Sequence, residues 1–280
     1  MKVLTIFSIF IFVLLVFFLY QNFKPQNKNC EELIDEIPQL IQKAKEGRDF
    51  LIVEVIDGDT LKTRENKTIR LLGINAPEKD MKFYDEAKEF VQNKTLNKKV
   101  YLVRDVESQD KYNRSLRYAF TEDSFINAEL LSQGLATLFI VKPNTKYEKL
   151  FTCLEDKAKI EKRGIWSFWK NTYIELKINY DAPGNDSENI NGEFITIKNK
   201  ENYTLNLTGW TIKDAATHIY KFKKEVYLNP NEEITLYSGT GTDSKKELYW
   251  NSNIPIWNND GDAAYLFDEK GNLITYSVYP

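Results

Sequence analysis

The sequence has few of the residues that most often bind transition metals or act as nucleophiles. Its 280 residues include one histidine and two cysteines. A lone His218 excludes zinc sites and phosphoryl-transfer sites that need two histidines. Cys30 and Cys153 lie far apart in the chain, which excludes a zinc ribbon and a dense disulfide framework. Any catalysis must therefore depend on carboxylates, arginines, hydroxyls or a hard cation bound by oxygen atoms.

A strong charge of one sign is also missing, because 41 acidic and 38 basic side chains give a formal net charge of −3. The average conceals a split along the chain. Residues 51–165 carry 21 basic and 19 acidic side chains, net +2, whereas residues 173–280 carry 10 lysines, no arginine and 16 acidic side chains, net −6. Six of the seven arginines lie in the first segment. Since the guanidinium forms paired hydrogen bonds with phosphate, that segment is the better candidate for binding nucleic acid.

One long apolar run stands at the N-terminus, where residues 3–20 are interrupted only by Thr5 and Ser8. No small residues that would mark a cleavage site follow it. At ~1.5 Å per residue the run just covers a hydrocarbon core ~30 Å thick. We therefore expect residues 1–29 to form an uncleaved, single-pass membrane anchor, with the rest of the chain outside the cell. A cleaved signal peptide and a secreted protein are the alternative, and lysines on both sides of the run leave the orientation nearly unmarked.

The rest of the chain divides into three segments. Residues 30–49 form a polar amphipathic stretch broken by Pro38, which predicts a short helical stalk. From 50 to 169, the pattern of β-branched runs and helical periodicity predicts five strands, at 51–56, 61–64, 68–74, 100–103 and 116–120, and three helices, at 81–94, 124–133 and 145–164. These elements suit a small α+β barrel with helices packed on it. From 173 to 280, short strand-like runs separated by turns predict an all-β sandwich.

Three short motifs of the central segment point to chemistry: IDGDT at 56–60, IRLLGINAPE at 69–78 and DKYNR at 110–114. Arg70 lies within an apolar strand, where an unpaired charge would cost several kcal/mol. It therefore needs a partner. One interpretation is an internal ion pair with Asp57, Asp59 or Glu78, and the other is a functional site.

Together with KPN at 142–144 and IW at 165–166, these motifs resemble the thermonuclease family of staphylococcal-nuclease-like domains, over roughly residues 51–166. The resemblance implies a five-stranded OB-type barrel with three helices, in agreement with the predicted elements. It also implies Ca²⁺-dependent hydrolysis of phosphodiester bonds in DNA and RNA, leaving 3′-phosphate products.

The resemblance also implies catalytic and metal-binding roles. Arg70 and Arg114 match the pair that holds the phosphate and stabilises its charge in the transition state, and Glu78 matches the general base. Asp59 matches a calcium-binding carboxylate, and Ala76 matches the position whose backbone carbonyl faces the ion. A hard cation, two guanidiniums and one carboxylate base can carry out in-line hydrolysis without histidine.

Substrate contacts are implied in the same way. Lys111 and Tyr112 resemble the residues that hold the second phosphate of a nucleotide. Lys142 lies in the matching loop, near the position where a base would stack. In that loop Phe139 and Val141 stand where the family often has tyrosines, so stacking is retained through Phe139 while a phenolic hydrogen bond is lost.

Asn75 is a second departure from the family pattern. It stands where well-studied members have a further calcium-binding aspartate. Its amide oxygen can still bind a cation, but one negative charge is lost. We therefore expect calcium to bind more weakly, or the metal preference to broaden.

Residues 173–280 resemble a lamin tail domain, which has an immunoglobulin-like sandwich fold. The matching motifs are GEFI at 192–195, LTGW at 207–210, LNPNE at 228–232, NDGD at 259–262 and LFD at 266–268. Such domains accompany secreted nucleases and membrane anchors in microbial proteins. The resemblance implies an interaction module, with a partner that is unknown.

The leading hypothesis from the sequence is a membrane-anchored, extracellular, calcium-dependent nuclease with a monomeric soluble part. One alternative is a surface protein whose barrel binds nucleic acid or another polyanion with weak or no catalysis. Another is an envelope adhesion protein centred on the sandwich. Cys30 and Cys153 either pair, tying the stalk to the last helix of the barrel, or stay as unpaired thiols.

Overall fold

The computed structural model describes residues 28–168, 173–216, 218–223 and 225–279. The chain forms two compact units, Met1–Asp35 and Glu36–Pro280. The apolar run predicted as a membrane anchor lies outside the described residues. Within those residues, no helix has the length and apolar character needed to cross a bilayer. Neither cysteine is a free thiol, which excludes the alternative of two unpaired thiols.

The predicted helical stalk is helical, in two pieces. The first piece, α2 (Cys30–Asp35), belongs to the first unit, and α3 (Ile37–Lys45) begins the second. Pro38 lies in the first turn of α3, where its missing N–H costs no hydrogen bond. α3 packs against β5 and β6 and buries Ile41 and Ala44, so this part of the stalk is packed against the barrel.

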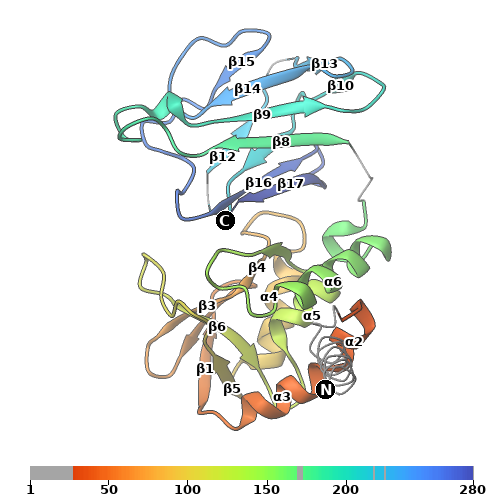
Figure 1. The fold of residues 1–280 in the computed structure, drawn as a ribbon, viewed down its shortest axis with the longest axis vertical. Coiled ribbons are helices and arrows are strands. Elements are labelled where there is room, and N and C mark those ends of the chain that lie inside the picture. The colour runs from red at the N-terminus through yellow and green to blue at the C-terminus, as the bar shows by residue number, and fades with distance from the viewer. Residues whose placement is uncertain (1–27, 169–172, 217, 224, 280) are drawn as a thin grey trace, which may run out of the picture. The chain divides into compact units, whose positions relative to one another are not determined.

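Five strands close into a barrel in the order β1-β2-β3-β6-β5 (Figure 1). Neighbouring strands are antiparallel except for the parallel pair β3 and β6. Alternate apolar side chains fill the interior, among them Ile52, Leu61, Ile69 and Val100. The five-stranded barrel predicted from the sequence is confirmed, with strands β1 (Asp49–Val55), β2 (Thr60–Thr63), β3 (Thr68–Leu71), β5 (Lys99–Val103) and β6 (Ser115–Phe120).

The run predicted as a single strand at 68–74 is divided. β3 ends at Leu71, and β4 (Gly73–Asn75) pairs instead with β7 (Thr137–Phe139), outside the barrel. Gly73 makes the division possible, because its φ is +76° and a Cβ there would lie 2.6 Å from Cε2 of Phe151. The turn carries the chain from the barrel wall to the residues predicted to bind metal.

The three predicted helices are present as α4 (Tyr84–Thr95), α5 (Ile126–Ser132) and α6 (Glu148–Ile160), followed by the short 3₁₀ helix η1 (Gly164–Trp166). α4 begins three residues later than predicted because Phe83 has a φ of +66°, which a right-handed helix does not accommodate. Each helix buries an apolar face; α4 does so through Ala87 and Val91.

Residues from 173 onward form two four-stranded sheets, β12-β11-β16-β17 and β15-β14-β9-β8, and a small pair, β10-β13 (Figure 1). A core of aliphatic and aromatic side chains, including Ile197, Leu236 and Trp257, fills the space between the sheets. The all-β prediction is confirmed. The elements are β8 (Ile174–Asn179), η2 (Ile190–Gly192), β9 (Phe194–Asn199), β10 (Leu205–Asn206), β11 (Thr211–Lys213), β12 (Ile219–Lys221), β13 (Tyr227–Leu228), β14 (Glu233–Tyr237), β15 (Glu247–Tyr249), β16 (Asp262–Phe267) and β17 (Leu273–Tyr279).

Strand β16 is buried on both faces. Ala264 and Leu266 belong to the sandwich core. The alternate residues Ala263 and Tyr265 belong to a second apolar cluster, which also contains Trp166 of the preceding domain. Because successive side chains of a strand point to opposite faces, β16 joins the sandwich domain (173–280) to the barrel domain (36–168).

Candidate active site

The turn between β1 and β2 places Asp59 against the segment that follows β4. Oδ2 of Asp59 accepts the backbone N–H of Ala76 at 2.8 Å, and its Oδ1 accepts the hydroxyl of Thr60 at 3.0 Å. Gly58 is required by space, since a Cβ there would lie 2.7 Å from Cβ of Ala76 and 2.9 Å from Cβ of Ala87. The close approach of turn, helix and strand holds Asp59 in a buried position.

Arg70 connects the predicted metal ligands. Its Nη2 lies 3.2 Å from Oδ2 of Asp59 and donates to Oδ1 of Asn75 at 3.0 Å. Its Nη1 donates to the carbonyl oxygens of Leu71, at 2.6 Å, and Ile74, at 2.9 Å. The internal ion pair expected as one interpretation of this arginine is therefore present, and Asp59 is the partner. The structure brings Asp59, Arg70, Asn75 and Ala76 together, as the resemblance implied.

The site holds an excess of negative charge. Burial, followed by repulsion from Asp59, raises the pKa of Asp57 to about 6, although Arg70 and the N–H of Asp59 oppose the shift. Two carboxylates of one turn thus compete for the single guanidinium beside them. Such a pair is typical of sites that attract a cation. Within the described ranges, no group of three or more histidine, cysteine, aspartate or glutamate residues could hold a metal, so any ion here would need amide, carbonyl or water oxygens as well.

Glu78 follows Pro77 at the edge of this site and is half-buried. Burial raises the pKa of the Glu78 carboxyl above its usual value, Lys213 opposes the shift, and Asp59 and Arg70 act on it more weakly. A carboxyl group whose pKa is raised toward neutrality is the kind that serves as a general base. Glu78 therefore lies within the electrostatic field of the Asp59–Arg70 pair.

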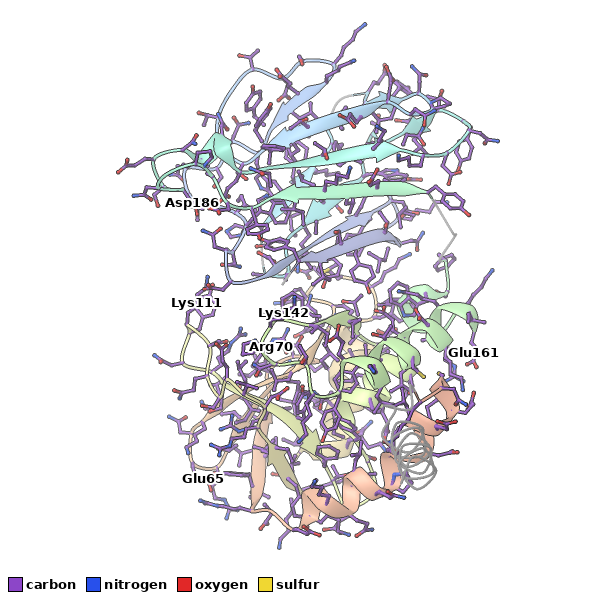
Figure 2. The ribbon with its side chains drawn as sticks, in the orientation of Figure 1. Glu65, Arg70, Lys111, Lys142, Glu161 and Asp186 are labelled. Atoms are coloured by element: carbon purple, nitrogen blue, oxygen red, sulfur yellow. The ribbon has the colours of Figure 1, made fainter. Side chains whose placement is uncertain are left out.

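Arg114 is held by its own loop. Its Nε donates to Oδ2 of Asp110 at 2.7 Å, while Oδ1 of Asp110 accepts the backbone N–H groups of Tyr112 and Arg114. The guanidinium of Arg114 and the ammonium of Lys111 both lie over the ring of Tyr112, at 5.4 and 5.5 Å from its centroid. In the described part of the chain no hydrogen bond or ion pair connects Arg114 with Glu78. Figure 2 shows Arg70, Lys111 and Lys142 at the end of the barrel domain opposite to Glu65.

The loop predicted to stack a base lies at the end of β7. Lys142 is exposed, whereas Phe139 is half-buried and packs against the cluster that contains Tyr265 and Trp166. A Cβ at Gly261 would lie 3.0 Å from Cγ1 of Val141. Both residues that replace the family's tyrosines are therefore close to side chains or backbone of the sandwich domain.

Two residues at the site were missed by sequence reasoning, and both come from the sandwich domain. The hydroxyl of Tyr265 is bonded to Nδ2 of Asn75 at 3.2 Å and lies 3.1 Å from Oγ1 of Thr137. Lys213 is 3% exposed, and its charge acts on Glu78. The signal available in the sequence was a lysine at the end of the strand-like run 210–213.

A small interdomain pocket completes the site. Asn75, Ala76 and Pro77 line it from the barrel domain, and Lys213 and Tyr265 line it from the sandwich domain. Its cavity volume is about 40 Å³. A few water molecules fit in such a space.

Two family models match the chain in succession. The model described as staphylococcal nuclease homologue matches residues 68–168, and the lamin tail domain model matches residues 173–280. Their order and positions confirm the two resemblances found in the motifs.

Individual relatives cover the same part of the chain. A thermonuclease from Staphylococcus intermedius is 32% identical over 129 residues, which are 43% of this chain and 77% of the relative. A thermonuclease from Staphylococcus hyicus is 30% identical over 127 residues, 42% of this chain and 75% of the relative. A prophage-derived endonuclease from Bacillus subtilis (strain 168) is 33% identical over 141 residues, 46% of this chain and 47% of the relative. The barrel, the relatives and the family models agree: the chain belongs to the thermonuclease family, which are hydrolases of the micrococcal nuclease type, and carries a lamin tail domain after its nuclease domain.

Proposed function

We propose that this protein is a calcium-dependent nuclease that hydrolyses phosphodiester bonds of DNA and RNA to 3′-phosphate products. The observation that supports it most is the network around Arg70, in which one guanidinium binds Asp59 and Asn75 beside the half-buried Glu78. These are the residues that the family resemblance assigns to metal, phosphate and general base.

The donor atoms suit calcium. The carboxylate of Asp59, the amide oxygen of Asn75 and the carbonyl of Ala76 are hard oxygen ligands of the type that Ca²⁺ prefers. A bound calcium ion would supply positive charge that polarises the phosphate. Arg70 now occupies the side-chain oxygens of Asp59 and Asn75, so ion binding would have to replace part of these contacts.

Each side chain has a distinct task in this proposal. Glu78 accepts a proton from the attacking water, and its raised pKa makes it a better proton acceptor than an ordinary exposed carboxylate. Arg70 is anchored by two backbone carbonyls through Nη1. Its Nη2 now bonds Asp59 and Asn75, and in this proposal it binds phosphate oxygens once the ion has replaced part of those contacts. Arg114 lies in a loop closed by its bond to Asp110, together with Lys111 and Tyr112, and this loop would contact the phosphates from the exposed side.

The test is cleavage of single-stranded DNA and RNA by the full-length chain, with Ca²⁺ or with a chelator. We expect Glu78→Gln to lower the rate at least ~100-fold, because general-base catalysis contributes about 10²- to 10⁴-fold. Glu86→Gln is the matched control, since Glu86 is an exposed carboxylate on α4. Cleavage without Ca²⁺, or equal rates for the two variants, would contradict the proposal.

We also propose that residues 3–20 anchor the protein in a membrane, with the barrel and sandwich domains outside the cell. The length and composition of this run support the proposal. Protease added to intact cells should digest both domains and leave the N-terminal segment in the membrane fraction. Recovery of the whole protein in the medium would favour the cleaved, secreted form instead.

A further inference from the structure

The sandwich domain touches the barrel domain at several points around the proposed active site. Tyr265 is bonded to Asn75. Lys111, which the resemblance places on a substrate phosphate, donates to Oδ1 of Asn258. Lys82 donates to Oδ1 of Asn272 at 2.6 Å. The contacts therefore involve a predicted metal ligand, a predicted phosphate contact and the segment that leads into α4.

Lys213 adds a buried positive charge to these contacts. Burial lowers the pKa of the Lys213 ammonium, and carboxylates act in the opposite direction, in the order Glu78, Asp214, Asp59 and Asp262. Two of the four, Glu78 and Asp59, belong to the proposed active site. Among the residues that the structure describes, no carboxylate oxygen lies within 4.0 Å of the Lys213 nitrogen. Its charge is thus placed in the field of the site without being fixed by a direct ion pair.

The sandwich domain leaves little space beside the predicted metal ligands Asn75 and Ala76. The interdomain pocket of about 40 Å³ is far below the ~300 Å³ that sites for molecules of nucleotide size occupy. Phe139, the residue expected to stack a base, is packed against the sandwich cluster. A base on Phe139, or a phosphate on Lys111, would therefore compete with contacts that the sandwich domain makes to the same side chains.

We propose that the sandwich domain is an inhibitory lid on the nuclease domain, with the Lys213 ammonium supplying in the closed form the positive charge that calcium supplies in the active form. The lid opens when calcium and nucleic acid bind, and Tyr265, Lys213 and Asn258 then leave the residues they now cover. This inference rests on the proposed nuclease function for the ligands that open the lid.

Most contacts between the sandwich domain and the barrel domain are weak enough to be broken when the two domains separate. Apart from the cluster around Tyr265, they are hydrogen bonds from long or polar side chains, such as Lys82 with Asn272 and Tyr276 with Glu155. Each such bond has a net value of only about 1 kcal/mol, because water replaces it on opening. Interfaces between domains of one chain generally permit relative motion unless they are large and apolar.

The first experiment fixes the lid in place. The full-length double variant Lys82→Cys/Asn272→Cys is treated with a bismaleimide, and the native cysteines do not compete because neither is a free thiol. Cross-linked protein should lose affinity for a single-stranded DNA oligonucleotide, and Ca²⁺-dependent cleavage, by at least ~10-fold, since the open fraction falls. The two single-cysteine variants, treated with the same reagent, are the controls. Unchanged binding and cleavage after cross-linking would overturn the proposal that the sandwich domain is an inhibitory lid.

The second experiment does not depend on catalysis. Brief acetylation followed by mass spectrometry reports the accessibility of Lys213, with the exposed Lys142 as an internal reference. In the catalytically impaired Glu78→Gln chain, Ca²⁺ plus oligonucleotide should increase labelling of Lys213 several-fold, and the cross-linked chain should stay protected.

The two readouts separate failure of the lid from failure of the nuclease proposal. If the wild-type chain does not cleave, the nuclease proposal fails. Labelling of Lys213 then tests by itself whether the sandwich domain acts as a lid. Increased labelling with oligonucleotide would support opening, and unchanged labelling would overturn it. If the wild-type chain cleaves while Lys213 stays protected, the lid is wrong and the nuclease proposal stands.

Discussion

The hydroxyl oxygen of Tyr265 lies 3.2 Å from Nδ2 of Asn75, although the two residues belong to different domains. Because Nδ2 donates to Tyr265, the amide oxygen of Asn75 is turned toward Arg70. Burial also raises the pKa of Tyr265, so its hydroxyl stays protonated at all physiological pH values. One tyrosine of the sandwich domain therefore orients the side chain that departs from the family's aspartate.

Removing this hydroxyl tests its contribution. In Tyr265→Phe, Asn75 and Thr137 lose a partner, and we expect a loss of about 1 kcal/mol in the free energy of unfolding, measured by thermal or denaturant unfolding. A weakened lid should also raise the cleavage rate at limiting DNA. Tyr227→Phe, at an exposed tyrosine of β13, is the control. A slower rate than in the wild type would argue that Tyr265 assists catalysis.

Restoring the family's carboxylate should strengthen metal binding. In Asn75→Asp, a second negative charge faces the ion, and we expect the Ca²⁺ concentration for half-maximal activity to fall roughly tenfold. Tyr265 can donate to the new carboxylate, so the fold should persist. Calcium titration of activity, or of binding by calorimetry, checks the result. An unchanged calcium dependence would show that residue 75 does not bind the ion.

Arg70 should tolerate no substitution, even by another cation. Lysine lacks the planar fork that reaches Asp59, Asn75 and two carbonyls at once. We expect Arg70→Lys to lower cleavage at least ~100-fold and the free energy of unfolding by about 3 kcal/mol. Arg64→Lys, at an exposed arginine at the end of β2, should leave both unchanged. Full activity in Arg70→Lys would show that a point charge suffices.

Glu193 gives the sandwich domain a pH-dependent stability. It is fully buried, its Oε2 accepts the N–H groups of Ile256 and Trp257, and its Oε1 has no partner in the described structure. Burial raises the pKa of Glu193 above its usual 4.5, so the folded chain binds the proton more tightly than the unfolded chain. Its contribution to the free energy of unfolding is therefore greatest below pH 4.5 and falls as pH rises through the folded-state value.

Glu193→Gln should remove this decline, because the amide keeps an acceptor oxygen and carries no charge. Relative to wild type, the variant should gain stability as pH rises from 4 to 7. Denaturant unfolding at several pH values measures the difference, with Glu225→Gln, at an exposed glutamate, as the control. A pH slope identical to that of the wild type would show that folding does not shift the pKa of Glu193.

Much of the architecture follows from local patterns. The barrel strands are short β-branched runs, and each helix has one apolar face, so their existence was predictable while some ends were not. The start of α4 and the end of β3 differ from the prediction because Phe83 and Gly73 have positive φ values. Those φ values depend on the packing around the two residues. Arg70 shows the same principle at the site, because an arginine in an apolar strand requires a partner, and the structure supplies Asp59.

The sandwich domain's part in the site could not be predicted from the sequence. Lys213 and Glu78 interact across a domain boundary, and no periodicity reports such a contact. In β16 every residue from 262 to 266 is buried, which is unusual for a sandwich strand with one solvent-facing side. The consecutive apolar residues 263–266 are a signal in the sequence that a second surface covers the sheet.

The boundary between the two domains has a kinetic consequence. The barrel domain's last described residue, Phe168, and the sandwich domain's first, Tyr173, are five residue steps apart, a span of at most roughly 18 Å even when fully extended. The sandwich domain therefore remains at a local concentration in the millimolar range after it releases the site. Nucleic acid would have to compete with this tethered domain, so half-maximal activity should need a higher substrate concentration than the open form alone would need, and the site should be covered again once substrate is exhausted.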